Sequence, residues 1–454
     1  MDDEQRAVPK EVGGRGFSIV SILPLVMLSF VVSLGFAALN LILPYYLLAL
    51  KGLLTKPPDT LARIRGTERV AIEFGAMTTG FMATRTLFAL VGGGLADSYG
   101  RRRMIITGSV IYVIVAVLYA FTSNVWQLIL LRSLQGAASA IVWPVAEATL
   151  IDLVPYYYRA RALALYTISF QAGNILGPVV GAAAYIIARG FLRGVDVLTL
   201  LRAPFLISAA IMVPGVVAAL LVPETVRNRV RGGLKAAALS FTTVFRYARG
   251  RVGRSIYAIF VNSLVNGLAL GIFTSVVMLF VMERVTANPV ILGIVFFVAS
   301  ITGMVTAYPM ARIADRLDVR SRKRMLVAAA YAARTAWLLI AFVSSVWQLL
   351  AAMILAQVGF SILLPLLRTA FAELVPSEMR GKAFGVQQAF FNAGMAVGPM
   401  IGATLYKLWS GWILLGGLLE GKQLVFIIAT LLGYFGATIL LLYYEPISIE
   451  KPTR

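Results

Sequence analysis

The chain has 454 residues, of which 59% are hydrophobic and only 13% are charged. Soluble domains carry roughly 45–50% apolar and about 25% charged residues, so this composition excludes a soluble protein of several domains and indicates a membrane protein. Cysteine and histidine are both absent. Their absence excludes disulfides, thiolate metal sites and histidine-based acid–base chemistry, and we expect no metal and no cofactor.

Twelve apolar runs along the chain are each long enough to cross a bilayer core of about 30 Å. We expect membrane spans at residues 19–50, 72–96, 104–121, 126–150, 163–186 and 198–222, and again at 256–281, 290–312, 325–343, 347–371, 383–406 and 423–444. The runs are continuous rather than alternating, which excludes a β-barrel. The predicted fold is an all-α integral membrane protein with twelve transmembrane helices.

An internal repeat divides the spans into two halves. Residues 124–185 align with residues 345–406 without a gap at an offset of 221, and 20 of the 62 positions are identical. Two related halves in a membrane chain suggest a pseudo-two-fold axis with a pathway between them, the architecture of a secondary transporter. We expect an N-terminal six-helix bundle at 1–225, a basic cytoplasmic linker at 226–254 and a C-terminal six-helix bundle at 255–454.

The net charge of +21 could suggest a nucleic-acid partner, but the placement of the charges argues against it. If the N-terminus is cytoplasmic, 26 of the 41 Lys and Arg fall on the cytoplasmic side and 11 on the outer side. This asymmetry follows the positive-inside rule. It predicts a multi-pass protein of the plasma membrane with both termini in the cytoplasm. The first outer loop departs from the rule, with Lys51, Lys56, Arg63, Arg65 and Arg69.

The segment between the second and third spans reads Gly-Gly-Leu-Ala-Asp-Ser-Tyr-Gly-Arg-Arg-Arg over residues 93–103. It resembles the signature loop of the major facilitator superfamily, with a degenerate copy that starts at Ala314. The resemblance implies a conformational latch in which Asp97 faces the start of span eleven and Arg101 reaches Asp152. The residues of this latch are Gly93, Asp97, Gly100, Arg101, Arg102, Asp152 and, in the second copy, Asp315.

Span four carries Arg132, Gln135 and Gly136, a pattern that resembles a motif linked in the same superfamily to proton coupling. An arginine inside a span costs roughly 2.5–3.5 kcal/mol on insertion scales, so it normally faces a cavity or a partner. The aligned residue of the second half is Met353, so the symmetry is broken here. The alternative is that Arg132 only braces helices or reaches the membrane surface.

Spans five and eleven share a face of small residues with a proline: Gly173, Gly177, Pro178 and Gly181 in the first half, and Gly394, Gly398, Pro399 and Gly402 in the second. Small residues at this spacing let helices pack closely, and proline allows bending. The span-five copy resembles the motif typical of drug/proton antiporters. Because both halves carry it, it could equally be an ancestral packing face.

Glu147 is the one acidic residue well inside a span, and its partner in the repeat is Arg368. The first span, where many proton-coupled drug exporters carry an acid, offers only Asn40. Glu147 could form a gate salt bridge with Arg368, carry the coupled proton, or brace its own helix.

Polar and aromatic residues in the spans suggest a substrate cavity, although such residues also serve as contacts between helices. The candidates are Asn40, Arg85, Trp143, Gln171, Asn174, Asn262, Asn266, Gln387 and Phe391. Arg85, Arg132, Arg334 and Arg368 outnumber the single interior glutamate, which hints at anionic cargo or bound lipid headgroups. Arginines held by backbone carbonyls are the simpler alternative.

These features predict a transporter and not an enzyme. The chain lacks histidine for a serine–histidine protease and lacks a Gly-x4-Gly-Lys-Ser/Thr phosphate loop for ATP-driven pumping. The resemblance is to the twelve-span drug/proton antiporters and implies rocker-switch export of small amphipathic compounds in exchange for protons. A facilitator or symporter of an organic anion is the alternative. We expect a monomer whose partners are its small-molecule substrate, protons and membrane lipids, with no nucleic acid.

Overall fold

The computed structural model describes residues 19–155, 158–226, 242–376 and 379–445. Within these ranges, the side chains at positions 90–95, 97, 160 and 415 are not described. Most of the predicted linker, residues 227–241, therefore lies outside the described residues. The first half holds α1 (Leu23–Leu50), α2 (Ala71–Tyr99), α3 (Arg101–Tyr119), α4 (Val125–Leu153), α5 (Arg159–Phe191) and α6 (Val197–Leu221). The second half holds α8 (Gly250–Arg284), α9 (Pro289–Arg316), α10 (Val319–Ile340), α11 (Val346–Leu374), α12 (Arg380–Leu408) and α13 (Gly421–Tyr443).

All twelve predicted spans are helices, and the prediction of an all-α membrane fold is confirmed. Within the described residues, nine of these helices are long and apolar enough to cross a membrane by length and composition alone. Some helices begin before their apolar runs where a polar cap satisfies the free N–H groups of the first turn. For example, the Asp318 side chain accepts hydrogen bonds from the N–H groups of Arg320 and Ser321, so α10 begins before its apolar run.

The repeated sequence begins both α4 and α11 in the same way. The Asn124 side chain accepts a hydrogen bond from the N–H of Gln127, and the Gln127 side-chain oxygen accepts one from the N–H of Asn124. In the second half, the Ser345 side chain accepts from the N–H of Gln348. A polar cap followed three residues later by glutamine is a capping box, and it sets the start of each helix.

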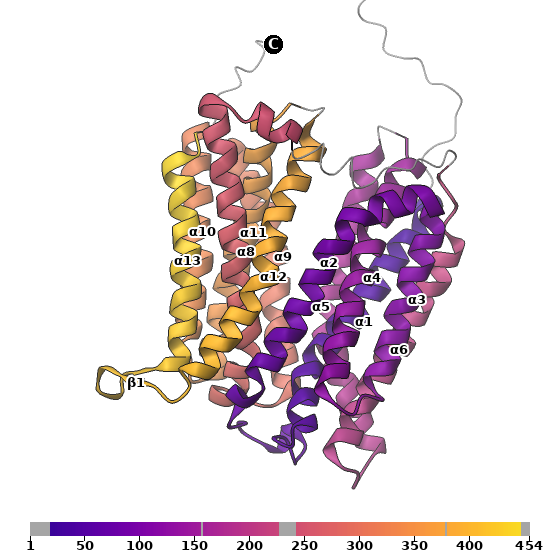
Figure 1. The fold of residues 1–454 in the computed structure, drawn as a ribbon, viewed down its shortest axis with the longest axis vertical. Coiled ribbons are helices and arrows are strands. Elements are labelled where there is room, and N and C mark those ends of the chain that lie inside the picture. Colours follow the sequence, from indigo (N-terminus) through magenta and orange to yellow (C-terminus); the bar gives the residue numbers. More distant parts are fainter. Residues whose placement is uncertain (1–18, 156–157, 227–241, 377–378, 446–454) are drawn as a thin grey trace, which may run out of the picture.

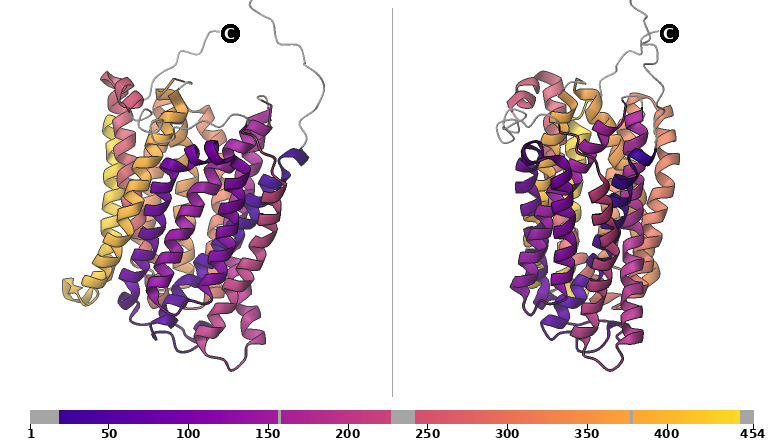
Figure 2. Two further views of the ribbon diagram at one scale, coloured as in Figure 1. Left: turned by 45° about the vertical axis from the view of Figure 1, so that its right-hand side comes forward. Right: turned by 90° about the vertical axis from the view of Figure 1, so that its right-hand side faces the viewer.

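The helices form two bundles that lie side by side, with the first half in indigo to magenta and the second in red to yellow (Figure 1). The helices run roughly along the long axis of the molecule in all three views (Figure 2). A short antiparallel hairpin between α12 and α13, β1 (Ile413–Leu414) with β2 (Leu419–Glu420), was not predicted. It lies at the same end of the molecule as the α1–α2 connection.

The glycine faces of α5 and α12 pack against the first helix of their own half. A Cβ added at Gly177 would lie 2.9 Å from the carbonyl oxygen of Leu34 on α1, and one at Gly398 would lie 2.4 Å from that of Leu268 on α8. Such distances leave no room for a side chain, so glycine is required for the close approach. The other glycines of these two motifs pack in the same way: Gly173 and Gly181 against α1, and Gly394 and Gly402 against α8.

Candidate functional site

The loop between α1 and α2, residues 51–70, folds over one end of the molecule; we call it the strap and this end the strap end. It contains two short 3₁₀ helices, η2 (Pro58–Thr60) and η3 (Thr67–Val70). Two contacts fix the strap to its own half: Lys51 pairs with Glu73 at 2.7 Å, and Asp59 pairs with Arg189 at the end of α5. The strap is therefore a folded element of the first half.

The middle of the strap is hydrogen-bonded to the second half. The N–H of Ile64 donates to the carbonyl of Met282 at 3.0 Å, and the N–H of Ala287 donates to the carbonyl of Ala62 at 3.0 Å. The Arg63 guanidinium reaches the carbonyl of Ser344 at 3.5 Å. These hydrogen bonds hold the strap against the end of α8 and the connection between α8 and α9. Two of them join backbone groups, so they do not depend on the type of side chain.

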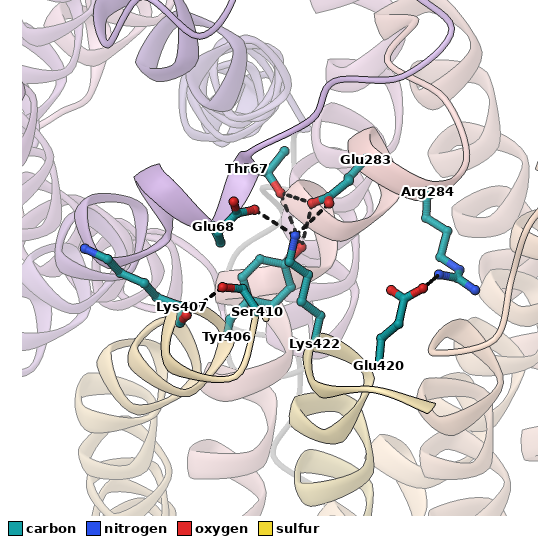
Figure 3. A network of polar contacts seen from close by, with 9 residues as sticks. All are labelled: Thr67, Glu68, Glu283, Arg284, Tyr406, Lys407, Ser410, Glu420 and Lys422. Atoms are coloured by element: carbon teal, nitrogen blue, oxygen red, sulfur yellow. Dashed lines mark hydrogen bonds and ion pairs between the residues drawn. The ribbon is translucent and has the colours of Figure 1, made fainter. Parts of the chain in front are cut away.

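A partly buried network of five side chains joins the two halves beside these bonds (Figure 3). We call it the strap-end network; its members are Thr67, Glu68, Glu283, Tyr406 and Lys422. The Lys422 ammonium, on a side chain that is only 9% exposed, lies 2.7 Å from a Glu68 oxygen and 2.6 Å from a Glu283 oxygen. Glu283 also accepts from the Thr67 hydroxyl at 2.6 Å and from the Tyr406 hydroxyl at 3.4 Å.

The charges of the strap-end network explain why it holds. Lys422 lies in the first turn of α13, where a cation is unfavourable because the helix dipole is positive there. The carboxylates of Glu68 and Glu283 offset this cost. Partial burial tends to raise the pKa of the Glu68 carboxyl, but the hydrogen bond and charge of Lys422 outweigh burial and hold that pKa below its ordinary value. Glu68 therefore favours its ionised form.

Two close helix contacts complete the strap end. A Cβ at Gly75 on α2 would lie 2.9 Å from the carbonyl oxygen of Pro399 on α12, and one at Gly293 on α9 would lie 2.9 Å from that of Pro178 on α5. Pro178 and Pro399 are repeat equivalents, so the two contacts are related by the pseudo-two-fold axis. The predicted proline motifs thus form the seam between the halves as well as the packing within each half.

At the opposite end, which we call the linker end, ion pairs form within each half. Arg101 at the start of α3 pairs with Asp152 at the end of α4. Arg322 at the start of α10 pairs with Glu373 at the end of α11, with 3.1 Å between the two charged groups. Each residue of the second pair lies 221 positions after its counterpart in the first. The two ion pairs are therefore copies of one ancestral contact.

The signature loop turns at Gly100, whose φ of 100° disfavours any residue with a Cβ. A Cβ there would also lie 2.5 Å from a carboxylate oxygen of Glu224, which accepts a hydrogen bond from the N–H of Arg101 at 3.0 Å. Arg102 donates to the carbonyl of Leu220 at 2.8 Å. Glu224 thus caps α3, and the sequence did not point to it.

Three other members of the predicted latch have separate outcomes. The surroundings of Gly93 and the side chain of Asp97 lie outside what the structure describes. Asp315 is exposed. At the start of α12, where the resemblance puts the partner of Asp97, a Cβ added at Gly381 or Gly385 would meet nothing within 4 Å. Both glycines are exposed, and no side chain that the structure describes covers them.

Arg132 lies within the first half between aromatic rings and neutral acceptors. Its guanidinium donates to the side-chain oxygens of Asn40 and Gln135, each at 2.7 Å. It also stands over the rings of Phe36 and Phe81, 5.2 and 4.8 Å from their centres. These contacts connect α1, α2 and α4. The positive charge of Arg132 is stabilised by neutral oxygens and ring faces rather than by a carboxylate. Gly136, one turn further on, packs against the backbone of Phe81.

An aromatic group continues from Arg132 toward the linker end. The rings of Trp143 on α4 and Phe170 on α5 are 5.0 Å apart and meet edge to face. Asn174 donates to the Phe170 carbonyl, and Gln171 beside it is exposed. Arg85 on α2 is half-buried and has no hydrogen-bond or ion-pair partner among the described residues. Of the four predicted cavity residues on these helices, Arg85, Trp143 and Asn174 are half-buried and Gln171 is exposed.

Glu147 on α4 and Arg368 on α11 are both exposed, although each lies well inside its helix. The positive charges that act on the Glu147 carboxylate come from Arg368, in the other half, and from Arg85. Neither Glu147 nor Arg368 forms an ion pair with a residue that the structure describes. The two charges therefore act on each other without forming an ion pair among the described residues.

The predicted cavity residues of the second half separate into two groups. Asn262 and Asn266 on α8 are hydrogen-bonded to each other, and Asn266 accepts from the buried Arg334 on α10. They form an internal brace of the second bundle. Gln387 and Phe391 on α12 are half-buried, and the Phe391 backbone packs against Gly267.

Comparison with known proteins decides the family. The model of the Major Facilitator Superfamily matches residues 25–333 and, in a second match, 259–454. The chain belongs to the Major Facilitator Superfamily. It is a multi-pass membrane transporter and not an enzyme, as the sequence predicted.

Curated relatives in this superfamily include two multidrug resistance proteins named MdtG. The protein from Enterobacter lignolyticus (strain SCF1) is 25% identical over 316 residues, which cover 69% of this chain and 71% of the relative. The protein from Klebsiella pneumoniae (strain 342) is 26% identical over 319 residues, covering 69% and 72%.

Solved structures in the superfamily share the fold. The nucleoside transporter NupG has a TM-score of 0.69 at 15% identity, covering 93% of this chain and all of that chain. A bacterial homologue of the human lysosomal transporter Spinster, in an inward-facing and unoccupied conformation, has a TM-score of 0.69 at 16% identity, covering 94% and 98%. The human organic anion transporter MFSD10 has a TM-score of 0.60 at 18% identity, covering 92% and 98%.

Proposed function

We propose that this transporter exports small amphipathic compounds in exchange for protons by alternating access, and that this structure is its inward-facing state. The linker end then faces the cytoplasm and the strap end faces outward. The distribution of Lys and Arg supports this orientation, with 26 on the linker side and 11 on the strap side. The likeness of the fold to a structure described as inward-facing is consistent with it.

One observation carries the proposal: Glu147 is exposed, has no ion-pair partner among the described residues and is acted on by the charge of Arg368 in the other half, while the strap end is joined across the halves. An unpaired carboxylate in a space open to the cytoplasm can take up or release a proton there. When the linker end closes, the approach of Arg368 favours the ionised carboxylate and opposes protonation. Proton occupancy of Glu147 is thereby linked to the position of the halves.

The surroundings of Glu147 suit an amphipathic substrate. Trp143 and Phe170 offer ring faces and edges, and Gln171 and Asn174 offer hydrogen-bonding groups on the next helix. Binding sites for small molecules are mostly apolar with a few polar groups that fix orientation, and this combination fits that description. The multidrug resistance proteins among the relatives are consistent with such a substrate class.

The Gly-Pro motif contributes little to the choice of function. Its copies on α5 and α12 pack in the same way against α1 and α8, so the motif serves the fold in both halves. The case for an antiporter therefore depends on Glu147 and on the relatives rather than on this motif.

An organic-anion carrier is the second candidate, and Arg85 is the observation that favours it. Its guanidinium is half-buried and unpaired among the described residues, and it acts on the same space as Glu147. A carboxylate or sulfonate on a substrate could pair with it.

Proton flux in proteoliposomes that contain a pH-sensitive dye distinguishes the two candidates. Lipophilic cations, neutral drugs and organic anions are added to the wild type and to Glu147→Gln. Substrate-evoked proton movement that is lost in Glu147→Gln supports antiport. Asp196→Asn is the control, because Asn caps α6 as well as Asp does and this residue lies outside the spans. Movement of labelled organic anions without protons would reject the exporter.

A further inference from the structure

A pocket of about 680 Å³ lies at the strap end between the two halves. Arg63 and Arg65 of the strap line it from the first half, and Glu283, Arg284, Glu420 and Lys422 line it from the second half. Figure 3 shows that Arg284 and Glu420 stand beside the strap-end network. The volume is within the range of about 300–1,000 Å³ that is typical of small-molecule sites.

Positive charge is in excess in this pocket. Its two carboxylates already have partners, because Glu283 pairs with Lys422 at 2.6 Å and Glu420 pairs with Arg284 at 2.8 Å. Arg63 and Arg65 have no carboxylate partner among the described residues; Arg63 contacts only the Ser344 carbonyl, at 3.5 Å. Two guanidinium groups of the strap are thus available to an anion.

Arg284 supplies a third guanidinium on the opposite wall. One terminal nitrogen pairs with Glu420 at 2.8 Å, and the side chain is 32% exposed. Part of this guanidinium side chain therefore remains accessible to an anion in the pocket.

We propose that the pocket binds the phosphate group of an anionic ligand and thereby holds the strap to the second half. A phosphate group has at least three acceptor oxygens, enough to engage Arg63, Arg65 and Arg284 together, whereas a carboxylate has two. The ligand is either a free phosphate compound in the outer medium or an anionic lipid whose headgroup enters the pocket; both present the same chemistry.

The site accounts for the charge of the first outer loop, which departs from the positive-inside rule. Arg63 and Arg65 are two of its five cations, and an outer anion site is a reason to keep them there. The lining residues come from both halves, so the complete site exists only when the strap end is closed. A ligand that binds one state better than the other shifts the equilibrium toward that state, so phosphate favours the closed strap end. This inference does not depend on the direction of transport or on proton coupling.

Calorimetric titration of inorganic phosphate tests the proposal on the full-length protein in nanodiscs of zwitterionic lipid. We expect saturable binding that weakens at least tenfold in the double variant Arg63→Gln, Arg65→Gln. Both arginines are exposed, so the double variant should fold. Lys56→Gln is the matched control, since Lys56 is an exposed cation of the same strap that does not line the pocket.

Nanodiscs that contain phosphatidylglycerol distinguish the two sources of the ligand. Phosphate binding in zwitterionic lipid identifies a free anion. A rise in melting temperature in anionic lipid that the double variant loses, without phosphate binding, identifies a lipid headgroup. Equal responses of the wild type and the double variant in both tests, or no response in either, would overturn the proposal.

Discussion

Replacement of Lys422 should open the strap end. The Lys422→Met variant removes the one cation of the strap-end network and leaves Glu68 and Glu283 facing each other without a positive charge. Removal of one partner from a fully buried ion pair costs about 3–5 kcal/mol, whereas an exposed pair contributes about 0.2–1 kcal/mol. The Glu68 and Glu283 side chains are 23% and 25% exposed, so an intermediate value of about 2 kcal/mol applies.

This energy is lost only from the closed state, because the network exists only when the halves meet. A change of about 2 kcal/mol corresponds to about a 30-fold shift in the ratio of closed to open molecules. The chain has no cysteine, so spin labels can be attached without removing native thiols. Thr55→Cys on the strap and Gly411→Cys between α12 and α13 provide exposed sites on the two halves.

Pulsed electron–electron resonance between these labels should show a longer-distance population in Lys422→Met. Lys56→Met is the control, and its distances should match those of the wild type. Glu283→Gln in the Lys422→Met background should restore part of the closed population, because it removes one of the two repelling carboxylates. An unchanged distance distribution in Lys422→Met would refute the assignment of the network as a closure.

Three further predictions follow from individual contacts. The lowered pKa of Glu68 means that its contribution to closure is complete above its ordinary pKa of about 4.3 and is lost as the pH at the strap end falls through the lowered value. The Thr55–Gly411 label pair should therefore lengthen in acid and stay short at neutral pH, and a distance independent of pH would reject this role. Gly75→Ala should open the strap end, because the new Cβ would lie 2.4 Å from that of Ala403. Gly190→Ala is the control and should leave the strap end closed, because its new Cβ would meet nothing within 4 Å. Equal label distances in the two variants would contradict a close contact between the halves at Gly75. Arg101→Gln and Arg322→Gln each break one ion pair, in different halves. Their shifts in melting temperature should therefore be small and additive. A double-variant shift well above the sum would contradict the independence of the two ion pairs.

The sequence was sufficient to predict the fold because apolar length and repetition specify it almost directly. Every expected span is a helix, and the 221-residue offset reappears in the structure as two equivalent ion pairs, Arg101–Asp152 and Arg322–Glu373. The second pair could have been found from the sequence by applying the offset to the first. The β1–β2 hairpin was missed because it contains only two residues in each strand, too few for an alternating pattern.

The strap-end network could not be predicted in the same way. Glu68, Glu283 and Lys422 each lie at the end of a span, where a charge normally remains in water. Their pairing depends on which loops meet when the bundles pack, and the three residues are far apart in the chain. No local spacing connects them, so only the tertiary structure identifies them as partners.

The interior polar residues show a second limit of sequence reasoning. The sequence predicts the same role for Asn262, Asn266, Gln171 and Asn174, because all four are amides within spans. Their surroundings differ: Asn266 is bonded to Arg334 inside the second bundle, whereas Gln171 is exposed. A helical pattern alone does not say whether a polar face meets a neighbouring helix or water.

The most direct test of alternating access is to measure both ends of the molecule in one set of variants. Arg103→Cys and Arg324→Cys place labels on exposed repeat-equivalent positions at the linker end, as Thr55→Cys and Gly411→Cys do at the strap end. We predict that Lys422→Met lengthens the strap-end distance and shortens the linker-end distance together. Opening of the strap end with no change at the linker end would contradict a mechanism in which the two halves rock as bodies.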